Sequence, residues 1–176
     1  MKKYFANIHA TEALKKAYKE LCLKLHPDKG GNAAEFVAMK EEYKEAAKRV
    51  AWEEAHSTDE ATKKRNTKKD GTQKTAEEIL AEQEQFAEVL EKLLGLDGLQ
   101  LEICGSWLWI TGNTFEWKAQ IKEAGCQFAS RKKAWFWHAG EWVRKIRKSF
   151  TMEEIRDLHG SEIIKANTVQ RIAAAH

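Results

Sequence analysis

The chain has 176 residues, of which 43% are hydrophobic and 32% charged, and its formal net charge is +3. This length suits one large or two small domains, with enough apolar side chains for compact cores. No apolar run is long enough to cross a membrane, and no apolar signal-peptide segment follows Met1, so we expect a cytoplasmic protein without membrane contacts. The three cysteines lie far apart, which indicates reduced thiols rather than disulfides.

The first long helix is predicted to follow Thr11, which stands where an N-cap is expected. Its apolar residues recur with helical spacing and would form one buried face: Leu14, Ala17, Tyr18, Leu21, Cys22 and Leu25. Pro27, the only proline in the chain, cannot continue a helix and biases His26 away from helical conformation. The helix should therefore end at about Leu25.

A second long helix is predicted after a turn at Gly30 and Gly31. Asn32 and Glu35 have the spacing of a capping box, which opens a helix. Its buried face would consist of Phe36, Met39, Tyr43, Ala46 or Ala47, and Val50. Residues 44–56 extend this helix, with Trp52 as a late apolar contact. The two helices should form an antiparallel hairpin joined by an exposed polar loop.

This hairpin resembles the J-domain of the DnaJ co-chaperones over residues 4–50. The resemblance rests on the pattern Lys-Lys-x-Tyr-x-x-Leu before His-Pro-Asp-Lys at 26–29, and on the two aromatic residues Phe36 and Tyr43 that follow. The double glycine after the motif is more typical of J-domains in viruses, phages and mobile elements. Two departures mark a minimal J-domain: only residues 4–8 could form a first helix, and no signature of a fourth helix follows Tyr43.

The resemblance implies docking on an ATPase chaperone of the seventy-kilodalton heat-shock (DnaK) type, whose ATP hydrolysis the J-domain would trigger. A basic helix would accelerate the encounter with an acidic surface of that partner. The simpler alternative for the tripeptide is a proline stop signal with solvated polar neighbours. The residues that the resemblance assigns to chaperone binding are His26, Pro27, Asp28, Lys15, Lys16, Lys19, Lys24 and Lys29.

Residues 57–74 are predicted to be a flexible linker, because Ala61 is their only apolar residue and little surface could be buried. Their lysines are either solvated or in contact with nucleic acid. Thr75 and Glu78 then form a capping box that opens a helix from about residue 76 to Leu94. Its apolar stripe could be a coiled-coil seam, but two heptads are short, so packing on the following module is favoured: Ile79, Phe86, Leu90 and Leu93.

The following module is predicted to have the order ββαββ. Strands are expected at residues 99–104, 107–111, 127–129 and 134–138, with a helix from Thr114 to about residue 124. The result would be a short antiparallel sheet with one helix covering one face. Further helices are expected around residues 142–146 and after Thr151, and the tail 161–176 is weakly helical. Gly105–Thr114 and Trp135–Trp137 resemble the C-terminal module of J-domain proteins from phages and integrated elements.

Basic and aromatic residues are concentrated in this module. Residues 103–149 hold nine basic and three acidic side chains, and six of the seven tryptophans. Strand alternation places Trp107 with Trp109 on one face, and Trp135 with Trp137 on one face of their own strand. These aromatics could form either a stacking platform for single-stranded nucleic acid or a tryptophan-rich core under the helix. The candidate residues for binding nucleic acid or a client protein are Trp107, Trp109, Arg131, Lys132, Lys133, Trp135 and Trp137.

The expected protein is mainly α-helical with a small α+β C-terminal module. Its parts would be a minimal J-domain at 1–56, a linker at 57–74, a capped helix with the tryptophan-rich module at 75–149, and a helical tail at 150–176. No phosphate loop, metal-ligand spacing or nucleophile constellation is present in the sequence, so no catalysis, cofactor or metal is expected. The expected function is that of a co-chaperone whose C-terminal module selects an unidentified client or target, and the alternative is a phage or mobile-element nucleic-acid-binding protein.

Overall fold

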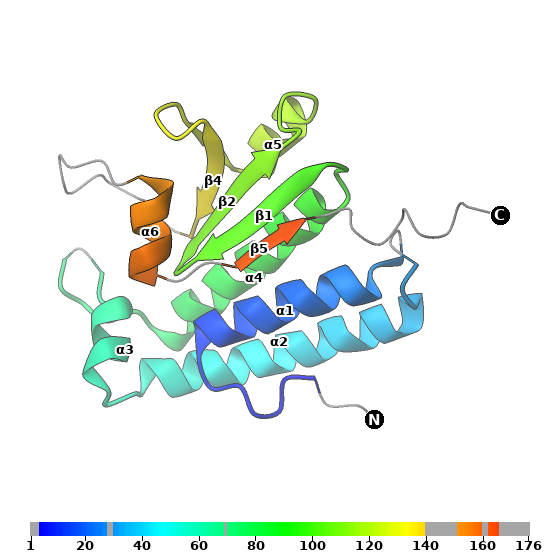
Figure 1. Cartoon of the computed structure of the whole chain (residues 1–176). Coiled ribbons are helices and arrows are strands. Elements are labelled where there is room, and N and C mark those ends of the chain that lie inside the picture. Colours follow the sequence, from blue (N-terminus) through cyan, green and yellow to red (C-terminus); the bar gives the residue numbers. More distant parts are fainter. Residues whose placement is uncertain (1–3, 28–29, 69, 140–150, 160–161, 166–176) are drawn as a thin grey trace. The chain divides into compact units, whose positions relative to one another are not determined.

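The structure is a computed structural model that describes residues 4–27, 30–68, 70–139, 151–159 and 162–165 (Figure 1). Two compact units make up the chain, Met1–Glu88 and Val89–His176. Their boundary falls inside helix α4 (Ala76–Leu94) and not in the segment predicted to be a linker. None of the described helices has the length and apolar character needed to span a membrane.

The first unit is built on a hairpin of two helices, α1 (Thr11–Leu25) and α2 (Ala33–Ala55). The ring of Tyr18 on α1 stacks on the ring of Tyr43 on α2, with centroids 3.9 Å apart, and Phe5 contacts the edge of Tyr43. The predicted buried face of α2 is confirmed in full: Phe36, Met39, Tyr43, Ala46, Ala47 and Val50. Trp52 was expected to be a late apolar contact and is instead 60% exposed, with its ring stacked on His56.

The ends of these helices follow the sequence signals in most respects. The helix α1 ends at Leu25 as predicted, and His26 has an extended backbone with φ −61° and ψ 129°. Asn32 caps α2 through its side-chain oxygen, which accepts hydrogen bonds from the backbone of Ala34 at 2.8 Å and of Glu35 at 3.2 Å. Thr11 was expected to cap α1, but the cap position belongs to Ala10. Residues 4–7 form bends and turns and residue 8 has no regular structure, so the short first helix is absent from this described segment.

The segment predicted to be a flexible linker contains helix α3 (Glu60–Arg65). Asp59 caps this helix by accepting a hydrogen bond from the backbone N–H of Thr62 at 2.9 Å. Thr67 and Gln73 then form an isolated antiparallel bridge. The prediction of an unstructured linker is therefore wrong for this segment, because polar contacts, and not apolar burial, hold it in place.

Helix α4 begins as the sequence predicted. The Thr75 backbone N–H donates to the Glu78 carboxylate at 2.9 Å, and the Glu78 N–H donates to the Thr75 hydroxyl at 3.3 Å, which is a complete capping box. The predicted apolar stripe is buried at all four positions, Ile79, Phe86, Leu90 and Leu93. Gln83 lies in the same stripe and is also fully buried.

The second unit contains a five-stranded antiparallel sheet with the order β3-β4-β2-β1-β5. Its strands are β1 (Leu99–Cys104), β2 (Trp107–Gly112), β3 (Gln127–Ala129), β4 (Ala134–His138) and β5 (Glu162–Lys165). The order ββαββ is confirmed for the first four. The fifth strand pairs with β1, which corrects the prediction of a helical tail at this position.

Two helices of the second unit differ in how well they were predicted. Helix α5 spans only Lys118–Glu123, because residues 114–117 form a turn and Thr114 does not cap it. Helix α6 (Met152–His159) opens with the predicted capping box, in which Thr151 and Glu154 exchange hydrogen bonds of 2.7 and 3.2 Å. The helix predicted around residues 142–146 lies outside the described residues.

The strand register divides the tryptophans between the two faces of the sheet. Leu108 pairs with Trp137 and Ile110 with Trp135, so these two tryptophans share a face with the aliphatic residues of β1 and β2. Trp107, Trp109 and Phe136 lie on the opposite face. There they pack with two residues of α6, Met152 and Ile155. Helix α6 therefore packs on this face of the sheet, whereas the sequence predicted only the helix after Thr114 as its cover.

Candidate functional site

The corner between α1 and α2 carries the motif that resembles a J-domain. The ring of His26 packs edge-on against Phe36, with centroids 5.2 Å apart, and Pro27 is exposed. Two backbone hydrogen bonds of 3.0 Å close the turn, from Gly30 to the Pro27 carbonyl and from Gly31 to the His26 carbonyl. Asp28 and Lys29 lie outside the described residues. The described part of the corner thus holds His26 and Pro27 in one defined geometry at the end of a packed helix.

The two glycines of this corner have different physical roles. Gly30 has φ +82°, a left-handed conformation that glycine adopts at no steric cost. Gly31 does not have a positive φ, but a Cβ atom there would lie 2.3 Å from the carbonyl group of Leu25. The chain can therefore return against the end of α1 only with glycine at position 31. Sequence reasoning assigned both glycines to the turn and missed this close approach.

The basic residues of α1 are not equivalent. Lys16 and Lys24 are exposed, whereas Lys15 is 5% exposed and Lys19 is fully buried. Sequence reasoning assigned all four of these lysines to docking, but Lys15 and Lys19 are not at the exposed surface of α1. Ala17, Leu21 and Leu25 belong to the predicted apolar face of α1 but are only half-buried. The buried side of the helix is therefore rotated relative to the predicted face.

The surroundings of Lys15 explain how a lysine can be buried there. Its Nζ atom lies 5.2 Å from the centre of the Phe86 ring, which attracts a cation through its π-electrons. Burial lowers the pKa of Lys15 from 10.5 to about 8, so the ammonium form is still favoured at neutral pH. The charged groups that act on this pKa are Glu82, Glu54 and Glu12, which raise it, and Lys74, which lowers it.

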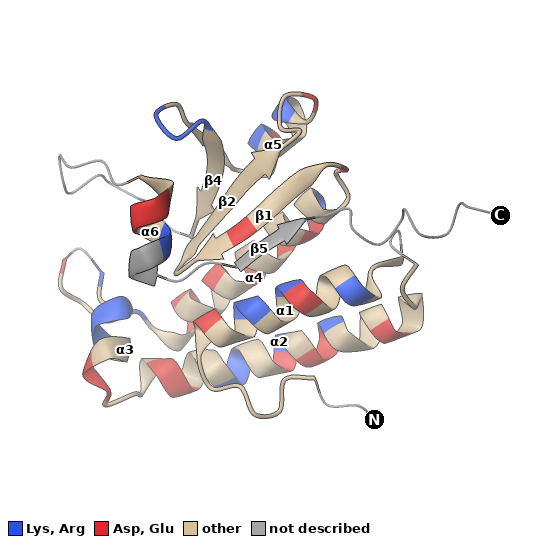
Figure 2. Ribbon diagram, viewed as in Figure 1, with Lys and Arg blue, Asp and Glu red and all other residues tan. Residues whose placement is uncertain are grey.

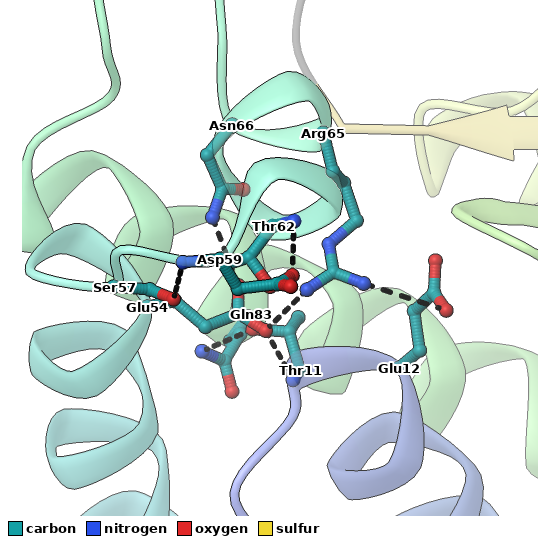
Figure 3. A network of polar contacts seen from close by, with 9 residues as sticks. All are labelled: Thr11, Glu12, Glu54, Ser57, Asp59, Thr62, Arg65, Asn66 and Gln83. Carbon is teal, nitrogen blue, oxygen red and sulfur yellow. Dashed lines mark hydrogen bonds and ion pairs between the residues drawn. The ribbon is translucent and has the colours of Figure 1, made fainter.

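A buried carboxylate organises the polar side of the first unit (Figure 3). Glu54 is 6% exposed and accepts hydrogen bonds from the Thr11 backbone N–H at 2.8 Å, from Arg65 at 2.9 Å and from Asn66 at 3.1 Å. These bonds join the start of α1, the end of α2 and the end of α3. Sequence reasoning did not single out Glu54, although it lies four residues after Val50 on the buried face of α2, where a carboxylate needs partners.

In the second unit, the four candidate tryptophans do not form one exposed platform. Trp135 and Trp137 are each 7% exposed and lie on the aliphatic face of the sheet. On the other face Trp109 is 4% exposed, and its ring stacks on that of Trp107 with centroids 5.9 Å apart. Lys132 is half-buried, with Nζ 5.5 Å from the centre of the Trp109 ring. These contacts favour the tryptophan-core interpretation.

Among the described residues of the second unit, the exposed aromatic side chains are two phenylalanines that sequence reasoning did not select. Phe115 is 91% exposed in the turn after β2, and Phe128 is 51% exposed on the edge strand β3. The next hairpin turn exposes Arg131 and Lys133, and the Lys and Arg positions of this turn and of α5 are blue on the ribbon of Figure 2. The antiparallel register of β2 and β4 brings Gly112, where β2 ends, next to this turn. Exposed basic and aromatic residues therefore lie in the loops and edge strand near this end of the sheet, and the aromatic residues differ from those predicted.

The described residues contain no group of three or more His, Cys, Asp or Glu side chains that could hold a metal ion. All three cysteines are free and buried, and burial raises the pKa of Cys126 to about 12, which disfavours the thiolate. The candidate site of the first unit is the corner at His26 and Pro27. Comparisons of the chain with protein-family models, with curated proteins and with solved structures find no match in any of the three.

Proposed function

We propose that this protein is a J-domain co-chaperone that binds a DnaK-type heat-shock ATPase and stimulates its ATP hydrolysis. The observation that carries the proposal is the corner itself: α1 ends at Leu25, His26 packs on Phe36, and Pro27 is exposed before a closed turn. Because residues 4–50 resemble J-domains, we assign this corner the chaperone-binding role that J-domains have. The C-terminal unit would select the client or target.

The proposed role needs no chemistry from this chain, because ATP is hydrolysed by the partner. A corner that is held in one conformation before binding loses little conformational entropy when it binds, which favours affinity. The exposed cations Lys16 and Lys24 would steer α1 toward an acidic surface of the chaperone. Asp28 and Lys29, which complete the motif in the sequence, would contact the same partner.

The steering role can be tested by measuring how fast the full chain associates with an ATP-loaded DnaK-type chaperone. The double variant Lys16→Glu/Lys24→Glu should associate at least about tenfold more slowly at low salt, because charge steering changes association rates by this order. Lys118→Glu/Lys122→Glu, with the same net charge but altered in the second unit, should associate at the wild-type rate. Equal slowing by both double variants would mean that net charge alone matters, and would contradict docking through α1.

A second candidate function is the binding of single-stranded nucleic acid by the second unit. It is favoured by the exposed rings of Phe115 and Phe128 and by the exposed cations Arg131 and Lys133 in the same unit, since bases stack on aromatic rings while cations bind phosphates. A labelled single-stranded oligonucleotide at low salt is the direct probe. Loss of binding in Arg131→Glu/Lys133→Glu would support this function, and no binding by the wild type would remove it.

A further inference from the structure

The start of α4 lies along α1 within the first unit. The Gln83 side-chain N–H donates to the Thr11 hydroxyl at 3.4 Å, and the Lys15 ammonium lies over the Phe86 ring at 5.2 Å. The Tyr43 hydroxyl donates to the backbone carbonyl of Gln83 at 3.2 Å, which ties α4 to α2 as well. Residues 76–88 are therefore a third helical layer on the hairpin.

This layer lies against the face of α1 that carries two of the four lysines assigned to docking, Lys15 and Lys19. Thr11, Lys15 and Lys19 are spaced by four residues and share one face of the helix. Lys15 on that face is 5% exposed, and Lys19 is fully buried. Lys16 and Lys24, on other faces, remain exposed. The contacts of Thr11 and Lys15 with α4 show that α4 covers this face over the first two turns of α1.

The contact between α1 and α4 is mixed in character. Ile79 and Phe86 supply apolar burial, at 2% exposure each. Two buried polar groups oppose this stabilisation, because burial removes their hydration: the Lys15 ammonium and the Gln83 amide. Release of α4 would restore water to both groups. An interface of this kind is easier to open than an all-apolar helix contact of the same size.

We infer that residues 76–88 of α4 compete with the chaperone for the same face of α1. The chain would exchange between a closed form, in which α4 packs on α1, and an open form, in which Lys15 and Lys19 are available to an acidic partner. The partner would bind the open form more tightly, so its apparent affinity would fall with the fraction of chain that is closed. This inference rests on the proposed co-chaperone function and adds a regulation to it.

The first test holds α4 on α1 covalently in the full chain. In Thr11→Cys/Gln83→Cys, a short bifunctional methanethiosulfonate reagent would join the two positions, whose side chains are already in contact, and a thiol reductant would release them. The crosslinked form should bind the ATP-loaded chaperone at least about tenfold more weakly than the released form. Wild type treated in the same way is the control, since its three cysteines are buried. Equal binding by the crosslinked and released forms would overturn the inference.

The second test weakens the contact instead. Phe86→Ala removes the ring under the Lys15 ammonium, and should raise the apparent affinity for the chaperone several-fold and speed amide hydrogen exchange in α4. Gln85→Ala, an exposed position of the same helix, is the matched control and should change neither. Faster exchange in α4 without tighter binding would overturn the inference. Failure of every form to bind or stimulate the chaperone, Phe86→Ala included, would instead overturn the proposed function itself.

Discussion

The rings of Tyr18 and Tyr43 stack with their centroids 3.9 Å apart and their planes inclined by 30°, and this contact joins α1 to α2. The Tyr43 hydroxyl is buried and donates to the Gln83 carbonyl at 3.2 Å. Burial raises the pKa of this hydroxyl well above its ordinary value, so it remains a donor under all ordinary conditions. One aromatic pair and one hydrogen bond thus connect three helices of the first unit.

The two parts of this contact can be separated by mutation. Tyr43→Phe keeps the ring and removes only the hydrogen bond, so the free energy of unfolding should fall by about 1 kcal/mol. Tyr18→Ala removes a fully buried ring and should cost about 3–5 kcal/mol. Urea denaturation followed by circular dichroism measures both. A larger loss for Tyr43→Phe than for Tyr18→Ala would contradict the assignment of stability to the stacked rings.

Gly31 should be the less tolerant of the two corner glycines. Gly31→Ala would place Cβ 2.3 Å from the Leu25 carbonyl group, so the loop must move away from the end of α1. Gly30→Ala meets no atom within 4 Å and suffers only from its positive φ, a cost of about 1–2 kcal/mol. Thermal unfolding should show the larger loss for Gly31→Ala, and its stimulation of the chaperone ATPase should fall with it. The reverse order would mean that backbone conformation, and not close approach, limits this corner.

The buried lysine of α1 gives a pH-dependent prediction. Burial lowers the pKa of Lys15 in the folded chain to about 8 from 10.5, so folding opposes protonation of this group. The burial of the charge therefore lowers the free energy of unfolding. This effect is present in full below the folded pKa of about 8, and it disappears as the pH rises to the ordinary pKa of 10.5 and above. Lys15→Met should therefore raise the free energy of unfolding by about 1–3 kcal/mol at neutral pH and by little near pH 10.

Urea denaturation of the two proteins at both pH values measures this difference. Lys63→Met, at an exposed position of α3, is the control and should have little effect at either pH. If Lys15→Met stabilised the protein equally at both pH values, the gain would come from better apolar packing of the methionine. The charge of the buried lysine would then not be the cause of the lower wild-type stability.

In the second unit, Arg156 of α6 donates to both carboxylate oxygens of Glu102 at 2.7 and 2.9 Å, and Glu102 is 4% exposed. Arg156→Met should cost about 2–3 kcal/mol, because it removes two charged hydrogen bonds from a buried carboxylate. Arg156→Met/Glu102→Gln should recover part of the loss, since no buried charge remains. Denaturation of the two variants checks this; equal losses would mean that the ion pair contributes through packing alone.

Local signals predicted the described elements that depend on neighbouring residues. Pro27 ends α1, and the capping boxes at Thr75 and at Thr151 open α4 and α6, because each signal acts within a few residues. The alternation of Leu99 with its neighbours likewise predicted β1. These elements are set by the local chain, so a single sequence contains enough information to find them.

Several features that sequence reasoning missed depend on contacts between elements. Helix α3 is anchored by bonds from Arg65 and Asn66 to Glu54, and β5 exists only by pairing with β1. The burial of Lys15 needs Phe86, which lies on a helix far along the chain. Periodicity places a residue on a face of its own element but does not identify which other element covers that face.

The most direct test of the co-chaperone proposal is the ATPase rate of a bacterial DnaK-type chaperone, measured in single turnover with and without this protein. Asp28→Asn is the matched variant, because it removes the charge of the motif while keeping the size of the side chain. We predict clear stimulation by the wild type that is lost in Asp28→Asn. Equal rates with the wild type, with the variant and with no added protein would contradict the co-chaperone function.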